Sequence, residues 1–173
     1  MTQKHPFLSW IANEDLKPGE DQCGPIINVL RDGYDAEISR LVLLSSHSHG
    51  DSRGRKLEAE QYVGNLKELY PNLRIEHASY ELDNPADYEE VTKATEAVLQ
   101  TLRDDPRVGP KSELTILLAS GTPTMVGVWV LLSQTSWDGP LPRLLSCQLS
   151  DAGVTIESAR LPFEFSSEVV YRE

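Results

Sequence analysis

The sequence predicts an α/β protein with a Rossmann-like, mostly parallel sheet that is flanked by helices. Short apolar stretches of strand length alternate along the chain with longer stretches whose apolar residues recur at helical spacing. The clearest unit runs from Leu114 to Trp137, where a buried strand, a turn of small residues and a helix follow one another. Near the C-terminus, two strands spaced for a hairpin predict an antiparallel edge at that end of the sheet. The 173 residues fit a single domain, 1–173.

The first half of the chain predicts two strands, each followed by a helix. Phe7 to Ala12 is a short apolar strand, and a polar loop from Asn13 to Asp21 follows it. Gly24-Pro25 then opens a short helix, because proline is well tolerated in the first helical turn. The second strand is Arg40 to Leu44. The helix after it has apolar residues at helical spacing: Leu57, Ala59, Tyr62, Val63, Leu66, Leu69 and Tyr70.

The second half continues the alternation and then closes the sheet. Leu73 to Leu82 mixes polar and apolar residues, as expected for a strand at a sheet edge. Asp83 to Asp87 predicts a helix start, with a cap residue, proline just inside and carboxylates in the first turn. One apolar stripe of that helix comprises Val91, Ala94, Thr95, Val98, Leu99 and Leu102. After the central unit, Arg143 to Leu149 and Val154 to Leu161 predict the two closing strands.

The turn after the central strand predicts an anion site. Thr122 is placed to cap the following helix, with Pro123 at its first position. Gly121 lets the backbone approach a ligand, while first-turn N–H groups and the hydroxyls of Ser120, Thr122 and Thr124 point at it. An ordinary turn between strand and helix with nothing bound fits the same residues, so turn chemistry alone leaves both interpretations open.

Composition excludes some classes of function. The net charge of -11 argues against an extended nucleic-acid surface, and we expect no binding of duplex nucleic acid. A small anion held by backbone amides and a few local bases stays possible. Cys23 and Cys147 are far apart and form no metal spacing, which indicates reduced thiols in a cytoplasmic protein. The sequence has no signal peptide pattern and no apolar run of membrane length.

The segment SSHSHGD after the second strand contains the spacing His-x-His-x-Asp, which occurs in metal hydrolases. Only His5 and His77 remain elsewhere, so a second set of ligands is missing and we expect no metal. We expect instead a loop at the strand end in which Ser45, Ser46 and His47 offer hydrogen bonds to a ligand.

A local basic cluster of Arg53, Arg55 and Lys56 follows this segment. For Arg55 and Lys56 the preferred interpretation is a solvated helix start. The sequence contains no GxSxG elbow, Walker lysine or GxGxxG turn, and no base is visible for a nucleophile at Ser120. We therefore expect neither catalytic residues nor a cofactor.

Two segments carry a resemblance to a known family. ASGTPTM at 119–125 resembles the signature after the fourth strand of CARF domains, the Rossmann-like sensors of CRISPR-associated proteins. LDNPADYEEV at 82–91 is similar to the matching stretch in the RtcR-like branch, named after the regulator of the RNA terminal phosphate cyclase operon. The resemblance covers almost the whole chain in element order.

The resemblance implies a homodimer that binds a cyclic oligoadenylate across its two-fold axis, over the ends of the first and fourth strands. The positions that match are Ile11, Ala12, Asn13, Ser120, Gly121, Thr122, Pro123, Thr124 and Met125, with Ser45, Ser46 and His47 included by position only. An isologous interface with two identical helix N-termini suits a ring of phosphates. The residues Met125, Val126, Val128, Trp129 and Leu132, with Gly127, form either part of the dimer contact or plain core.

The resemblance also implies a function, namely an allosteric sensor domain that controls an attached effector in type III CRISPR antiviral defence. Cyclic tetra-adenylate is the favoured ligand, and the hexa-adenylate is possible. Many CARF signatures carry a lysine where this chain has Pro123, so we expect binding without efficient cleavage. The alternatives are a stand-alone ring nuclease and an RNA-end-sensing domain of a transcription activator. Because no effector module is visible, we expect a domain excised from a longer protein.

Overall fold

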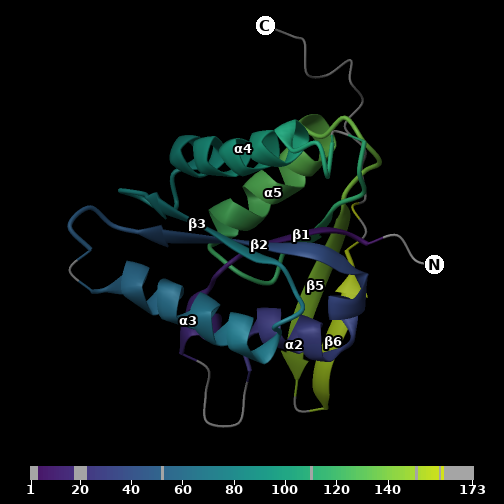
Figure 1. Ribbon diagram of the computed structural model, residues 1–173. Coiled ribbons are helices and arrows are strands. Elements are labelled where there is room, and N and C mark those ends of the chain that lie inside the picture. Colours follow the sequence, from purple (N-terminus) through teal and green to yellow (C-terminus); the bar gives the residue numbers. More distant parts are fainter. Residues whose placement is uncertain are drawn as a thin grey trace, which may run out of the picture.

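The computed structural model describes residues 4–17, 23–51, 53–109, 111–150 and 152–159, together with Leu161. Strands and helices alternate along the chain as predicted, and helices cover both faces of a central sheet (Figure 1). Within the described residues, no helix is long and apolar enough to cross a membrane. Cys23 and Cys147 are free thiols.

The sheet has 6 strands in the order β3-β2-β1-β4-β5-β6. Their bounds are β1 His5–Trp10, β2 Ile38–His47, β3 Ile75–Glu81, β4 Thr115–Leu117, β5 Arg143–Ser150 and β6 Gly153–Ser158. Neighbouring strands from β3 to β5 pair in parallel, and β6 pairs antiparallel with β5. The predicted Rossmann-like fold with an antiparallel C-terminal edge is confirmed. Because β1 lies between β2 and β4, the strand order reverses direction at the boundary of β1 and β4.

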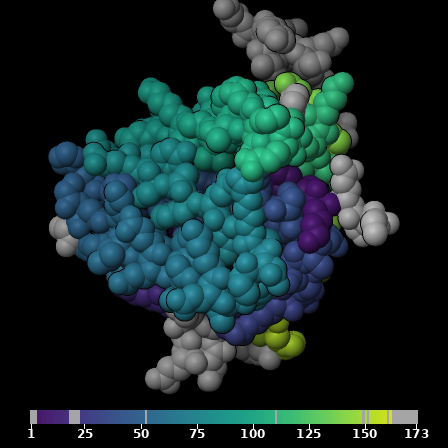
Figure 2. All heavy atoms as spheres, viewed as in Figure 1, coloured from purple at the N-terminus to yellow at the C-terminus, as the bar shows by residue number. Residues whose placement is uncertain are grey.

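The helices are α1 Asn13–Leu16, α2 Pro25–Arg31, α3 Arg55–Leu69, α4 Tyr88–Asp104 and α5 Pro123–Thr135, with a 3₁₀ helix at Tyr34–Glu37. α4 and α5 cover one face of the sheet, whereas α2 and α3 cover the other (Figure 1). From the side shown in Figure 2, residues of α3, β3 and α4 form most of the visible surface. The strand β3 stands at one end of the strand order, so it is an edge strand, as its mixed composition predicts.

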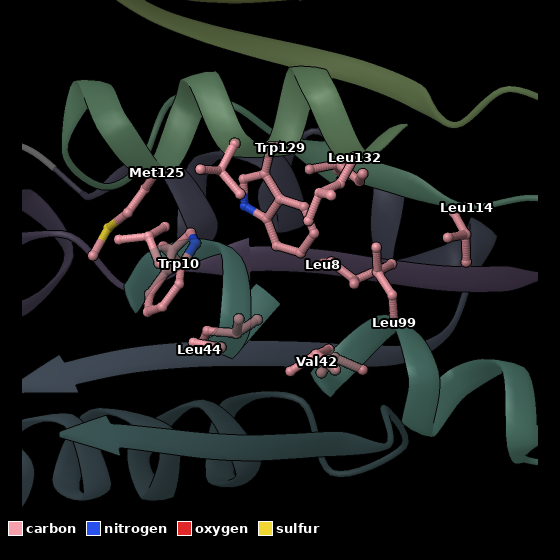
Figure 3. Packing of buried hydrophobic residues seen from close by; sticks show 14 of the residues in the cluster. Leu8, Trp10, Val42, Leu44, Leu99, Leu114, Met125, Trp129 and Leu132 are labelled. Atoms are coloured by element: carbon pink, nitrogen blue, oxygen red, sulfur yellow. The ribbon is translucent and has the colours of Figure 1, made fainter. Parts of the chain in front are cut away.

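Each face of the sheet has its own hydrophobic core, because side chains alternate along a strand. On one face, Leu41 and Leu43 of β2 pack with residues of α2 and α3. On the other, Val42 and Leu44 pack with residues of α4 and α5 (Figure 3). The predicted stripe of α4, Val91, Ala94, Thr95, Val98, Leu99 and Leu102, is buried throughout.

The apolar residues of α5 belong to the core, which excludes most of them from a dimer contact. Met125, Val128, Trp129 and Leu132 are all buried in the α4–α5 core (Figure 3). Gly127 faces α4 within the protomer, where a Cβ would make an ordinary van der Waals contact of 3.4 Å with the Tyr88 hydroxyl.

Several predicted boundaries are wrong. Pro85 is not inside α4, which starts at Tyr88 after its cap Asp87. Ala12 is not the last residue of a strand, because β1 ends at Trp10 and Ala12 is the N-cap of α1. The predicted polar loop therefore begins with a short helix, and residues 18–21 of that loop lie outside the described part of the chain. Two residues of the predicted stripe of α3, Leu57 and Leu69, are exposed.

Candidate functional site

A pocket of about 590 Å³ opens at the carboxyl ends of the strands, where the strand order reverses. In open α/β sheets this crevice is the usual ligand site. The loops after β1, β2 and β3 and the turn after β4 form its walls. Its lining residues are Ile11, Ala12, Asn13, Glu14, Ser46, His47, Ser48, Asp51, Arg53, Arg55, Leu82, Asp83, Pro85, Gly121, Thr122 and Met125.

The turn after β4 has the predicted local structure. The Thr122 hydroxyl accepts a hydrogen bond from the Met125 N–H at 3.2 Å and donates one to the Pro85 carbonyl at 2.9 Å. Gly121 has a φ of 108°, and a Cβ there would lie 2.9 Å from the Met125 sulfur and 3.3 Å from the Trp10 Cβ. The turn therefore requires glycine for conformation and for space, because Met125 and Trp10 lie directly against it.

Three predicted residues of this turn lie outside the pocket wall. Ser120 is completely buried, and its hydroxyl donates to the Asp15 carboxylate at 3.2 Å. Thr124 is buried as well, and its hydroxyl donates to the Ala86 carbonyl at 3.0 Å. Pro123 is exposed and does not line the pocket. Contrary to the prediction, the hydroxyls of Ser120 and Thr124 do not point into the pocket but form hydrogen bonds within the protein.

The loop after β1 supplies Ile11, Ala12 and Asn13, three of the residues expected to contact a ligand, to the pocket lining. Behind them lies Asp15, which the sequence analysis does not single out. Its carboxylate is 2% exposed and accepts hydrogen bonds from Ala12 N at 2.9 Å, from Ile26 N at 3.1 Å and from the Ser120 hydroxyl. Burial raises the pKa of Asp15 to about 6, although these hydrogen bonds act in the opposite direction.

Arg53 and Arg55 bring positive charge into the pocket. The Arg55 guanidinium donates a hydrogen bond to the side chain of Asn13, which joins the loops after β1 and β2. Asp51 caps α3 by accepting from the N–H groups of Arg55 at 2.9 Å and Lys56 at 3.0 Å. The helix α3 starts at Arg55, whose half-buried side chain also lines the pocket, whereas Lys56 is exposed and lies outside the pocket lining.

Ser45, Ser46 and His47 lie in β2 and not in a loop, because the strand continues to His47. Ser45 is buried and shares a hydrogen bond of 2.7 Å with the His77 ring, so it does not reach the pocket. Ser46 and His47 line the pocket, and His47 Nδ1 lies 3.1 Å from the Ser79 hydroxyl. The other ring nitrogen of His47 is therefore the one that remains for a ligand.

The walls carry charged groups of both signs together with apolar surface. Arg53 and Arg55 are basic, Asp51 is one of three acidic residues of the lining, and Ile11, Leu82 and Met125 provide apolar surface. Glu14 and Asp83 add carboxylate acceptors for N–H donors. Among the described residues, no group of three His, Cys, Asp or Glu side chains is arranged to hold a metal ion.

Fold and site together define a Rossmann-like α/β protein with a ligand pocket at the switch point of its sheet. A search of solved structures finds the same fold in Enterococcus italicus Csm6 bound to cyclic hexa-2'-fluoro-hexa-dAMP. The match has a TM-score of 0.66 and 21% sequence identity, and it covers 84% of this chain and 34% of the Csm6 chain. No protein-family model and no curated protein matches the sequence.

Proposed function

We propose that this chain is a ligand-sensing domain of the CARF type that binds a cyclic oligoadenylate in the pocket at the switch point. The observation that carries the proposal is the pocket itself, which places two arginines and the start of α5 around one crevice. The fold supports it, because the similar Csm6 structure holds a cyclic adenylate analogue. The assignment to the RtcR-like branch depends on the segment 82–91, part of which lines the pocket.

The phosphates of the ligand would bind at the arginine side of the pocket. Guanidinium groups form charge-assisted, often bidentate hydrogen bonds with phosphate oxygens. Arg55 is held by Asn13 and its backbone by Asp51, so part of the entropy of ordering this side chain is already lost before binding. The N-terminus of α5 adds partial positive charge beside Gly121 and Thr122.

An adenine base would bind on the apolar side of the same pocket. Ile11, Leu82 and Met125 offer surface for the faces of the ring, and the thioether of Met125 adapts well to aromatic partners. The carboxylates of Glu14 and Asp83 lie on this lining as acceptors for the amino group that adenine carries. Guanine presents a carbonyl oxygen at that position, which a carboxylate repels.

The size of the pocket favours a dimer with a shared ligand. About 590 Å³ lies within the range of roughly 300–1,000 Å³ that encloses one drug-sized molecule. A ring of four or six nucleotides is considerably larger, so one protomer would hold only part of it. We propose cyclic tetra-adenylate as the first candidate and cyclic hexa-adenylate as the second, each bound between two copies. The bound dimer would control an attached effector in type III CRISPR antiviral defence.

The proposal includes binding without efficient cleavage by the domain itself. Pro123 stands where many CARF signatures carry a lysine, so the turn offers no side-chain cation for the reacting phosphate. The alternative is a ring nuclease, in which Arg53 or Arg55 would supply that charge. Chromatography of the ligand after incubation with the protein distinguishes the two, since only a ring nuclease yields linear products at many turnovers.

Calorimetric titration of the chain with cyclic tri-, tetra- and hexa-adenylate tests the proposed function. We expect Arg55→Ala to weaken binding about tenfold to a hundredfold, the scale of one lost hydrogen bond between charged groups. Lys56→Ala is the matched control, because it removes the neighbouring charge without touching the pocket lining. The absence of binding to all three rings, or equal losses in both variants, contradicts the proposal.

A further inference from the structure

The two loops that face each other across the switch point are connected beneath the pocket by Asp15. Its Oδ2 accepts hydrogen bonds from Ala12 N at 2.9 Å, in the loop after β1, and from the Ser120 hydroxyl at 3.2 Å, in the turn after β4. Its Oδ1 accepts from Ile26 N at 3.1 Å, at the start of α2. One carboxylate therefore connects the start of α1 with the start of α2 and with the turn after β4, 105 residues further along the chain.

This carboxylate belongs to the layer behind the ligand. Asp15 is 2% exposed and Ser120 is 0% exposed, and neither lines the pocket. Their immediate neighbours in the chain do, namely Asn13 and Glu14 on one side and Gly121 and Thr122 on the other. A shift of either partner thus changes the distance between the two walls without removing any group that contacts a ligand.

The close packing around Asp15 leaves the carboxylate no alternative position. A Cβ at Gly24 would lie 2.5 Å from both the Asp15 Cα and its Oδ1, so the chain before α2 presses directly on this residue. A buried carboxylate without a cationic partner is costly for the fold, and among the described residues Asp15 is paired with hydrogen-bond donors and no cation. Such a costly arrangement is easier to understand if it serves the pocket.

We propose that Asp15 is a positioning residue that fixes the spacing of the two pocket walls, and that Ser120 transmits this constraint to the turn after β4. The identity of the ligand in this inference rests on the proposed function, whereas the hydrogen-bonded connection between the two walls does not. In its ionised form the carboxylate accepts all three hydrogen bonds. Protonation removes one acceptor site and weakens the connection, so the positioning is strongest above the pKa of Asp15, about 6.

A pH titration of the ligand-free protein, followed by the amide NMR signals, tests the connection. The amide signals of Ala12 and Ile26 report the protonation of Asp15 directly, because both N–H groups donate to its carboxylate. We expect the amide signal of Gly121 to shift with pH in parallel with them. In Ser120→Ala, Ala12 and Ile26 should still titrate while Gly121 becomes independent of pH in this range. The other titratable groups around Asp15 are Glu14, Tyr62 of α3 and Cys147 of β5, and burial raises the pKa values of Tyr62 and Cys147 away from this range.

Calorimetry with cyclic tetra- and hexa-adenylate then tests the consequence for binding. Ser120→Ala should weaken binding about tenfold, the scale of one hydrogen bond to a charged group. Ser133→Ala is the matched control: Ser133 is also a buried serine, on α5, and its hydroxyl donates only to the Val130 carbonyl of that helix. In Asp15→Asn, the further change Ser120→Ala should have a smaller effect than in the natural sequence, because the two residues act together.

The outcomes separate this inference from the proposed function. A Gly121 signal that ignores the titration of Asp15, or equal ligand affinities in Ser120→Ala and Ser133→Ala, overturns the positioning role. If the unchanged chain binds neither ring while Gly121 follows Asp15, the proposed ligand is wrong and the connection between the walls stands.

Discussion

At the scale of single residues, two carboxyl groups show how the same chemistry has opposite effects in different surroundings. Asp15 accepts three hydrogen bonds and has no cationic partner within the described residues, and burial raises its pKa to about 6. Asp105 forms hydrogen bonds with Arg107 and an ion pair of 2.8 Å with the buried Arg40, and these partners hold its pKa well below the usual range. Ionised Asp105 therefore stabilises the fold, whereas ionised Asp15 destabilises it.

The first prediction concerns stability against pH. Because the pKa of Asp15 is about 6 in the folded chain and near 3.8 in an unfolded one, the folded state takes up the proton first. Acidification from pH 7 to 4.5 should stabilise the native state through this residue, by about 2 kcal/mol. Urea denaturation gives the free energy of unfolding of the natural sequence and of Asp15→Asn at pH 7 and at pH 4.5. The difference between the two proteins should change by this amount between the two pH values.

Other groups that titrate are common to both proteins and cancel in that comparison. Burial lowers the pKa of His77, so acidification below 6.5 costs stability there in both proteins. The contribution of Asp105 is lost only below 3.8, outside the measured range. A difference between natural sequence and variant that stays constant from pH 7 to 4.5 contradicts the environment assigned to Asp15.

The residues of the site differ in how far the sequence reveals them. Gly121 and Thr122 were predictable because their roles, a positive φ and a helix cap, depend on the adjacent residues alone. Asp15 was not, since two of its three donors, Ile26 N and the Ser120 hydroxyl, come from segments that only the tertiary fold brings beside it, whereas Ala12 is three residues away. Arg55 likewise resembles any exposed helix start until Asn13 and the pocket lie beside it.

At the scale of elements, the start of α5 was predicted correctly and the start of α4 was not, and the hydrogen bonds between the two segments give the reason. The start of α5 follows its local signals, Thr122 and Pro123. The signals before α4 fail because the hydroxyls of Thr122 and Thr124 donate to the carbonyls of Pro85 and Ala86. These contacts hold the segment as a loop against α5, and the helix begins only after Asp87. The same hydrogen bonds place Pro85 in the pocket wall.

The second prediction compares the two caps. Thr122 caps α5 and Asp87 caps α4, and replacing either by alanine should reduce the free energy of unfolding by about 1–2 kcal/mol. Only Thr122→Ala should also weaken ligand binding, because Thr122 lines the pocket and holds Pro85, whereas Asp87 does neither. Urea denaturation and calorimetry on both variants measure the two effects. Equal losses of affinity in the two variants contradict a specific role for the start of α5.

At the scale of the whole molecule, the two ends of the sheet have different tasks. At the amino end of the strands, buried Arg40 pairs with Asp105 at 2.8 Å and lies 3.5 Å from Glu76, and buried His5 lies 2.6 Å from the Thr115 hydroxyl. These contacts join neighbouring elements. At the carboxyl end the loops diverge around the pocket, as in other open α/β sheets. Buried ion pairs and the pocket thus lie at opposite ends of the strands.

The last prediction concerns the stoichiometry of binding. Because the ring exceeds the pocket of about 590 Å³, this chain of 19.3 kDa should bind one cyclic oligoadenylate ring per two copies. Each copy has a net charge of -11, so two copies repel one another, and the ligand adds negative charge. Arg53 and Arg55 of both copies must offset this repulsion locally, and their loss should reduce dimer formation in the presence of ligand.

Sedimentation with and without cyclic tetra- or hexa-adenylate measures the mass of the protein, and calorimetry measures the ratio of bound rings to chains. A monomer that binds one ring per chain contradicts the shared site, since the ring would then have to fit within one protomer.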